Sequence, residues 1–258
     1  MSQRRKIQIT ISTLSVAISF YYYLNREKST FSKFRIIQKE KKDGFLSFKI
    51  SQQPKIHVPY YYAVKHPNIQ ALRHYSPILD EGLLKFIIRL YPVGLMGEYL
   101  STADQIEMKG PYSHPALNNI DFEKVINDKS PILCIAAGTG VLPFYQILRK
   151  YPNANIKLLY CTNDDLLKSE LSVYSVKYYS SNERLTEESI EIDQDYKYVI
   201  VCGSEKFTNA LCGYDNDEQY SMKSMYNFEN GIPFEVKSKE LSGWLCKLKF
   251  KKEQVFVL

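Results

Sequence analysis

The sequence predicts a membrane-spanning helix followed by two domains, an antiparallel β-barrel and an α/β domain built on a parallel sheet. Three observations support this fold class. Residues 7–24 form an 18-residue stretch without a charged side chain. β-prone runs separated by turns occupy about 44–115. A strand–helix alternation begins near 131, which is typical of a parallel sheet covered by helices.

These patterns set the expected boundaries along the chain. The basic residues that follow the uncharged stretch indicate a linker rather than a strand. We therefore expect a membrane anchor over 1–25, a basic linker over 26–43, a β-barrel over 44–122 and an α/β domain over 123–258.

The uncharged stretch has the length of a membrane helix. As a helix it would span about 27 Å, close to the roughly 30 Å apolar core of a bilayer. Tyr21, Tyr22 and Tyr23 lie at its end, where amphipathic rings suit the interface. A cleaved signal peptide fits poorly because no small-residue cleavage site follows, and a moderately apolar soluble helix is a second reading. The Arg-, Ser- and Thr-rich start resembles a mitochondrial address, with an endoplasmic-reticulum anchor as the alternative.

Charge and composition exclude several classes of function. The first 42 residues contain ten basic and two acidic residues, whereas residues 43–258 carry a net charge of −2. A nucleic-acid-binding body would be more basic, so we expect no nucleic-acid partner. The five cysteines and four histidines show neither disulfide nor metal-ligand spacing, so we expect no disulfide framework and no metal site.

Local patterns place the expected elements. In the barrel, the pattern predicts strands at 45–50, 60–64, 83–91 and 106–109, the last ended by Gly110-Pro111, and a short helix at 96–102. In the second domain it predicts strands at 131–136, 156–161, 173–179 and 198–202, and helices at 141–150 and 166–171. The tail over 244–258 alternates as one or two edge strands would, and the polar residues 213–230 receive no assignment.

Three short motifs carry the chemistry. Arg73-His74-Tyr75-Ser76 lies between two expected strands, where an arginine can hold a phosphate with two parallel hydrogen bonds. Gly138-Thr139-Gly140 follows a buried strand and precedes a helix whose N-terminus attracts phosphate. Cys202-Gly203 ends the fourth strand of the second domain. Taken alone, each motif is also compatible with an ordinary turn or loop.

In this order the motifs resemble those of the ferredoxin-reductase superfamily, and most closely those of NADH-cytochrome b5 reductases. Arg73, Tyr75 and Ser76 match the family's R-x-Y-S/T motif. Ile87–Tyr91 resembles V-I-K-V-Y, and Gly94–Gly97 resembles G-x-M-S. The resemblance extends over about 31–258 through Gly110-Pro111, through Gly138–Pro143 for G-T-G-I-T-P and through Cys202-Gly203 for the start of C-G-P-P-P-M.

The resemblance implies a membrane-anchored flavoprotein that passes electrons from NADH through FAD to a haem or quinone acceptor. It implies catalytic roles for Ser76 and Cys202 beside the reacting rings. The implied cofactor-binding residues are Arg73, Tyr75, Ser76, Arg89, Tyr91, Met96, Gly97, Gly138, Thr139, Gly140, Cys202 and Gly203. Carboxylates in Asn163-Asp164-Asp165, after the second strand, would bind ribose hydroxyls and favour NADH over NADPH.

Some family positions are substituted. Gly97 replaces a serine, and Leu142 replaces a threonine that contacts the flavin in the family. Ser204–Lys206 replaces three prolines, and Leu258 replaces a terminal aromatic residue. Each lost hydrogen bond to a charged group is worth roughly 1.5–3 kcal/mol. Two hypotheses follow: an active reductase that donates to a haem protein, or a degenerate reductase fold, with or without FAD, serving as an accessory subunit of a mitochondrial inner-membrane respiratory complex.

Overall fold

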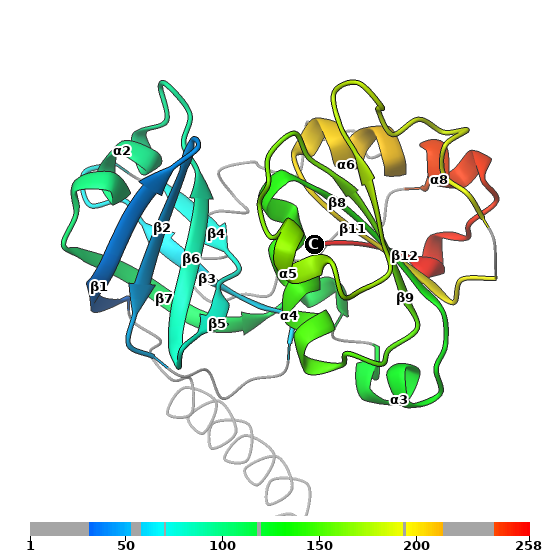
Figure 1. Ribbon diagram of the computed structural model, residues 1–258, viewed down its shortest axis with the longest axis horizontal. Helices are drawn as coiled ribbons and strands as arrows, with labels where there is room; N and C mark the ends of the chain where they lie inside the picture. The colour runs from blue at the N-terminus through cyan, green and yellow to red at the C-terminus, as the bar shows by residue number, and fades with distance from the viewer. Residues whose placement is uncertain (1–30, 53–57, 70, 118–119, 193–194, 214–239) are drawn as a thin grey trace, which may run out of the picture.

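The computed structural model describes residues 31–52, 58–69, 71–117, 120–192, 195–213 and 240–258. Two sheets organise this part of the chain, and each forms its own domain (Figure 1). The first sheet is wholly antiparallel and the second wholly parallel, so the expected order of barrel and α/β domain is confirmed.

The first sheet has seven strands in the order β4-β3-β7-β1-β2-β6-β5. Its strands are β1 (Ser32–Lys42), β2 (Phe45–Ile50), β3 (Tyr60–Lys65), β4 (Leu72–Tyr75), β5 (Ile78–Asp80), β6 (Leu83–Arg89) and β7 (Gln105–Ser113). The edge strands β4 and β5 are separated in sequence only by Ser76 and Pro77, which can span about 7–10 Å at most. The sheet must therefore curl until its two edges meet, as an open barrel.

Alternating side chains fill the barrel. Leu46, Phe48 and Ile50 of β2 point inward and are at most 1% exposed, as strand geometry requires of every second residue. The rings of Phe48 and Phe86 stack with centroids 5.1 Å apart. A short helix, α2 (Leu95–Thr102), closes one end with Met96 and Leu100 buried against this core.

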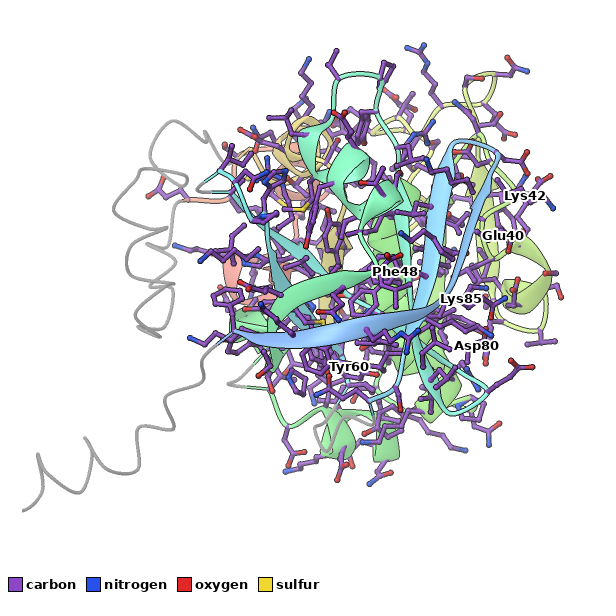
Figure 2. The ribbon with its side chains drawn as sticks, turned by 90° about the vertical axis from the view of Figure 1, so that its left-hand side faces the viewer. Glu40, Lys42, Phe48, Tyr60, Asp80 and Lys85 are labelled. Atoms are coloured by element: carbon purple, nitrogen blue, oxygen red, sulfur yellow. The ribbon has the colours of Figure 1, made fainter. Side chains whose placement is uncertain are left out.

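The expected basic linker over 26–43 is wrong for residues 32–42, because these form β1. Figure 2 shows β1 and β2 as one long hairpin, with Glu40 and Lys42 towards its tip. Asp43 and Gly44 connect the strands with φ of 50° and 78°, the left-handed pair that a two-residue hairpin turn requires. The Asp-Gly pair was the sequence signal for this strand. β7 also runs past the expected end at Gly110-Pro111 to Ser113.

The second sheet has the order β10-β9-β8-β11-β12. Its strands are β8 (Ile132–Ala137), β9 (Ile156–Cys161), β10 (Val176–Tyr179), β11 (Tyr198–Cys202) and β12 (Val255–Val257). The central strand β8 packs one face against α4 (Leu142–Lys150) and α5 (Lys168–Leu171). Its other face packs against α6 (Glu205–Cys212) and α8 (Trp244–Lys247). The remaining short helices are α3 (Phe122–Asn127), η1 (Pro115–Leu117), η2 (Gly138–Val141) and η3 (Lys252–Gln254).

The tail contains one edge strand, not two. Trp244–Lys247 begins the segment that alternates in sequence, yet it forms α8, since Leu245 packs into the core beside α6. Val255–Val257 forms β12 and pairs with β11 in parallel. Alternation over so few residues is compatible with a helical turn, and packing against α6 decided the outcome.

One helix joins the two domains. Gln146 of α4 is 6% exposed, and its Oε1 accepts a hydrogen bond from the Tyr60 amide at 2.8 Å. Its Nε2 donates to the carbonyls of Tyr60 at 3.0 Å and of Pro77 at 2.5 Å. Arg149, one turn later, donates to the carbonyl of Leu79. The helix that begins at the glycine motif is thereby fixed to the barrel beside the arginine motif.

The expected membrane anchor over 1–25 lies outside the described residues. Within the part of the chain that the structure describes, no helix is both long and apolar enough to cross a membrane. The unassigned segment at 213–230 also lies almost entirely outside that part.

Candidate functional site

Three loops meet at the carboxyl edge of the parallel sheet. β8, β9 and β11 are adjacent and parallel, so Gly138–Gly140, Thr162–Asp165 and Cys202-Gly203 leave the same edge. Figure 1 shows this edge turned towards the barrel, with the end of the chain beside it. η2 contacts β6 of the barrel. Crevices of this kind are where open α/β sheets bind ligands.

The glycines at this edge serve different purposes. A Cβ on Gly140 would overlap the carbonyl of Cys202, and one on Gly203 would lie 2.7 Å from the Phe207 ring. Glycine at 140 therefore lets η2 approach the end of β11, and glycine at 203 leaves room for the Phe207 ring of α6. Gly138 has φ of 54°, and nothing lies within 4 Å of where its Cβ would be. It makes a left-handed turn that leaves open space above the backbone.

The arginine motif lies on a strand and not in a loop between strands. Arg73 and Tyr75 are on the edge strand β4, paired with Val64 and Tyr62 of β3. Figure 1 shows β4 on the side of the barrel that faces the parallel sheet. The Arg73 side chain is exposed and donates to the carbonyl of Leu72 at 2.9 Å. Ser76, just beyond the strand, is partly buried.

The two residues between Arg73 and Ser76 face opposite ways. Tyr75 packs against the barrel core, and burial raises the pKa of its hydroxyl to about 12, so it is a neutral hydrogen-bonding group. His74 points to the other face, where its ring lies 5.1 Å from that of Tyr61. His74 is therefore directed away from the face shared by Arg73 and Tyr75.

Arg89 connects the barrel to the second domain. It ends β6, and its Nη1 lies 2.6 Å from Oδ2 of Asp164, the residue expected to bind ribose. The guanidinium also lies over the ring of Phe45, 5.5 Å from its centroid. Asn163 is occupied as well, since its Oδ1 accepts from the Ser181 amide. Asp165, the second carboxylate expected to meet a ribose, is 94% exposed and pairs with Lys168 at 2.8 Å, so both expected carboxylates have protein partners.

Three further predicted residues lie where β6 leads into α2. Tyr91 is 65% exposed and Val93 92%, so the loop presents apolar surface to solvent. Met96 is 8% exposed and belongs to the barrel core, so its side chain is directed away from any ligand on that surface. A Cβ on Gly97 would come within 3.1 Å of the Leu90 Cδ2.

Cys202 is half-buried at the end of β11, and burial raises the pKa of its thiol to about 12. It is therefore a neutral thiol at physiological pH and not an activated nucleophile. The structure brings Cys202 together with Gly140, and it pairs Arg89 with Asp164.

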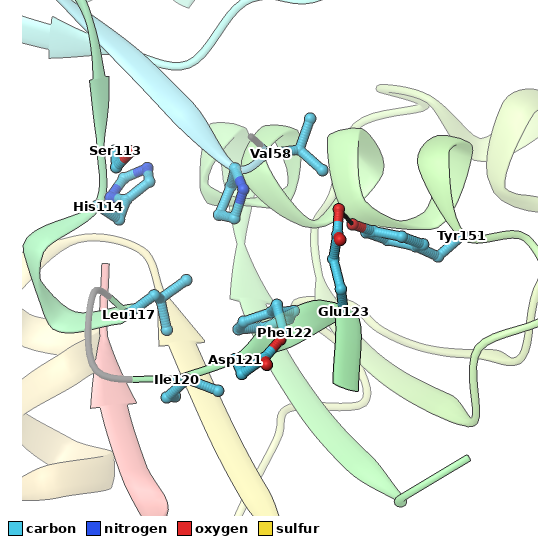
Figure 3. Close-up of a pocket in the computed structure, with 10 residues that line it drawn as sticks. Val58, Ser113, His114, Leu117, Ile120, Asp121, Phe122, Glu123 and Tyr151 are labelled. Atoms are coloured by element: carbon cyan, nitrogen blue, oxygen red, sulfur yellow. Dashed lines mark hydrogen bonds between the residues drawn. The ribbon is translucent and has the colours of Figure 1, made fainter. Parts of the chain in front are cut away.

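A separate cavity of about 290 Å³ opens near the base of the junction (Figure 3). Val58, His114, Leu117, Phe122 and Tyr151 are among its lining residues. None of the predicted site residues lines it, so it is distinct from the edge that carries the motifs.

No protein-family model matches the chain. A curated FAD-binding protein of Schizosaccharomyces pombe is 31% identical over 166 residues, covering 58% of this chain and 59% of that protein. NADH-cytochrome b5 reductase 2 of Aspergillus oryzae is 29% identical over 221 residues, covering 72% of this chain and 61% of that protein. The chain is thus similar in sequence to proteins named FAD-binding protein and NADH-cytochrome b5 reductase. It spans about three fifths of the length of these relatives.

Solved structures show the same fold. The CS-b5R domains of human Ncb5or superpose with a TM-score of 0.57 at 16% identity, covering 90% of this chain and 71% of that one. A ferredoxin-NADP+ reductase mutant of Plasmodium falciparum gives 0.56 at 15% identity, covering 90% and 98%. At these identities the likeness establishes the reductase fold alone.

The structure shows where two of the positions that depart from the resembled motifs lie. Leu142 is 3% exposed and packs in the core under η2, so its side chain offers no contact to a ligand. Ser204 begins α6 and Lys206 lies in its first turn, so a helix follows Cys202-Gly203 directly. The main group missed by sequence reasoning was Gln146, whose signal was a polar residue in an otherwise apolar stretch of helix.

Proposed function

We propose that the chain is an FAD-dependent oxidoreductase that accepts hydride from NADH and passes electrons on to a haem protein. The main support for this proposal is that η2, at the carboxyl edge of the parallel sheet, contacts β6 of the barrel. In addition, Gln146 fixes α4 beside the arginine motif. A flavin on the barrel and a nucleotide on the sheet edge would then adjoin. The relatives' names, which include FAD binding and NADH oxidation, support the same reaction.

The barrel side fits FAD. Arg73 is exposed, and its Nη1 donates to the carbonyl of Leu72, which leaves further guanidinium donors for a phosphate. Tyr75 is neutral and can donate or accept a hydrogen bond. Tyr91 presents an uncovered ring on the adjoining loop. A cation, a hydroxyl and an exposed aromatic face are what a dinucleotide with a flat ring requires.

The sheet edge fits a nicotinamide nucleotide. Gly138 leaves open space above the backbone, and η2 leads into α4, whose N-terminus attracts phosphate. Arg89 supplies a cation next to it. Asp164 disfavours an added ribose phosphate by charge, so we propose NADH as the donor in preference to NADPH.

In the reaction, the two cofactors supply the hydride and electron chemistry. The chain's own residues bind and orient them. Arg73 on β4 and Arg89 at the end of β6, both on the barrel, would hold anionic groups, and Ser76 would offer a hydroxyl beside Tyr75. Cys202, as a neutral thiol, would lie beside the nicotinamide ring without adding charge. Gln146 keeps the two domains at a constant separation.

We further propose that residues 1–25 anchor the protein in a mitochondrial membrane. The uncharged stretch at 7–24 and the basic start support this proposal. Alkaline carbonate extraction of purified mitochondria tests it: the full-length chain should stay in the pellet and a chain lacking residues 1–25 should not. Recovery of the full-length chain in the supernatant, or only in endoplasmic-reticulum membranes, contradicts it.

A second candidate function is that of an accessory subunit of a mitochondrial respiratory complex, with the reductase fold kept and turnover lost. Burial of Leu142 favours it, because the family's threonine contact to flavin is replaced by a core side chain. Under this proposal the isolated protein would bind FAD weakly or not at all and would co-purify with a membrane complex.

One experiment separates the two. The purified protein, supplied with FAD, is inspected for a bound-flavin spectrum and then mixed anaerobically with NADH. Oxidoreductase function predicts retained flavin and its bleaching by NADH, followed by reoxidation on adding cytochrome b5. Arg73→Leu should lose flavin, whereas Arg184→Leu, a change in the exposed segment between β10 and β11, should not. Absence of flavin from the wild type contradicts the first function and supports the second.

A further inference from the structure

An ion pair crosses the domain junction at the proposed nucleotide site. Arg89 ends β6 of the barrel, and Asp164 lies just after β9 of the parallel sheet. Nη1 and Oδ2 are 2.6 Å apart, with side chains 44% and 22% exposed. This is therefore a short, charge-assisted hydrogen bond at the surface of the crevice and not a buried structural pair.

Asp164 and Arg89 are each held in place by contacts within their own domain. The Asp164 amide donates to the Thr162 hydroxyl at 3.1 Å, and that hydroxyl donates to the Asp164 carbonyl at 3.2 Å. The Arg89 guanidinium lies over the Phe45 ring. The contact thus joins two preorganised groups, which lowers the entropy cost of keeping them together.

The position of Asp164 gives the pair its significance. An acidic residue after an early strand of such a sheet binds ribose hydroxyls in many dinucleotide sites. Here the Asp164 carboxylate instead accepts a hydrogen bond from Arg89 of the other domain. Arg89 is also a residue that the family resemblance assigns to cofactor binding. Ligand and carboxylate therefore require the same guanidinium.

We propose that Asp164 is a built-in competitor for the anionic part of the nicotinamide nucleotide, occupying Arg89 until the nucleotide displaces it. This rests on the proposed function. The nucleotide phosphates and the Asp164 carboxylate are both anions, so bringing both to Arg89 costs Coulomb energy that either alone avoids. Displacement releases the carboxylate to the crevice and leaves the Arg89 guanidinium to the nucleotide.

The direction of the predicted effect distinguishes this role from a structural one. If the pair only held the domains together, removing the carboxylate would weaken nucleotide binding or leave it unchanged. If Asp164 competes, Asp164→Asn tightens binding while the free protein becomes no more stable. Because the pair is partly exposed, we expect a modest tightening of about two- to fivefold, the size that exposed pairs support.

The experiment measures binding of NAD+ by isothermal titration calorimetry to the flavin-loaded full chain. Asp164→Asn should lower the dissociation constant roughly two- to fivefold at low salt, with a smaller effect at high salt. The matched control is Glu187→Gln, which removes one carboxylate from a pair of similar length, 2.8 Å to Lys247, at a side chain that is 27% exposed. Lys247 belongs to α8, away from the barrel (Figure 1). This control should leave the NAD+ dissociation constant unchanged within twofold.

A double-mutant cycle completes the test. Arg89→Met should weaken NAD+ binding, and Asp164→Asn should then have no further effect. Equal or weaker binding by Asp164→Asn in the wild-type background overturns the proposal, as does the same tightening with Arg89 removed. If the wild type binds NAD+ and Asp164→Asn leaves the dissociation constant unchanged, only the proposed competition by Asp164 is wrong. If neither protein binds NAD+, the proposed function fails with it.

Discussion

At the scale of single residues, the proposed site departs from the motifs it resembles at a few positions. Gly97 is the clearest case, because the resemblance places a phosphate-binding serine at its position. The structure shows that a Cβ would meet only the flexible end of Leu90, at 3.1 Å. A serine can therefore be restored with a small side-chain adjustment.

We predict that Gly97→Ser tightens FAD binding about three- to tenfold. The added hydroxyl would contribute a hydrogen bond to a charged group, offset in part by the shift of Leu90. Flavin fluorescence titration of apoprotein measures the change. Gly97→Ala adds the same Cβ without the hydroxyl and serves as control; equal tightening by both variants would assign the effect to helix propensity alone.

His114 provides a second residue-scale prediction, on pH. Its Nε2 is buried without a hydrogen-bond partner among the described residues, and its ring lies 4.8 Å from that of Tyr61. Burial, aided by nearby His74, lowers the pKa of His114 to about 4 from its ordinary value of 6.5. Because the unfolded chain binds the proton first, stability should fall between pH 6.5 and 4, by at most about 1.4 kcal/mol per pH unit.

Urea denaturation at pH 7, 5.5 and 4.5 measures this loss. His114→Phe keeps an aromatic ring against Tyr61 but cannot titrate. Its free energy of unfolding should depend less on pH over this window than that of the wild type. An identical pH profile for the two proteins would show that His114 is not the titrating group.

At the scale of elements, helix α4 makes hydrogen bonds that connect the two domains. Its first turn follows the glycine motif, and Gln146 and Arg149 attach it to the backbone of β3 and to the segment around β5. A single buried amide thus satisfies three backbone groups of another domain. Small displacements of this helix would change the distance between the proposed flavin and nucleotide sites.

We predict that Gln146→Met, similar in volume, lowers the free energy of unfolding by about 2–4 kcal/mol, because buried backbone groups lose their partners. Hydrogen exchange at the Tyr60 amide should accelerate. Lys150→Met, on the exposed end of the same helix, is the control and should change stability by less than about 0.5–1 kcal/mol. Unchanged exchange at Tyr60 in Gln146→Met would contradict the role assigned to this amide.

At the scale of the whole molecule, the proposed cofactor site lies where the two domains meet. Because β1 belongs to the barrel, its basic residues join the folded body, and residues 32–258 carry a net charge of +2. The near-neutral body expected from 43–258 therefore understates the positive charge available for an acidic electron acceptor.

A ligand that binds across the junction should stabilise the whole molecule. We predict that FAD at about 100 times its dissociation constant raises the free energy of unfolding by about 2.7 kcal/mol. Riboflavin lacks the phosphates that Arg73 would hold, so at equal concentration it should stabilise far less. Thermal unfolding followed by intrinsic fluorescence measures both. Equal stabilisation by the two would remove Arg73 from the proposed site.

Sequence reasoning located strands where the signal was local. Ile132–Ala137 is apolar on both faces and formed the central strand β8 within one residue of its expected bounds. It failed at 32–42, where many charges suggested a linker although Asp43-Gly44 marks a hairpin. It also failed at Trp244–Lys247, where contact with α6 and not local alternation decided the conformation.

The sequence by itself determined the order of the two domains, the arginine and glycine motifs and the resemblance that connects them, because these depend on residue types at close spacing. Only the tertiary structure decided which groups share a partner. Arg89 and Asp164 are 75 residues apart, and Gln146 and Tyr60 are 86 apart. Such contacts arise from how two sheets are oriented, and no local pattern records that orientation.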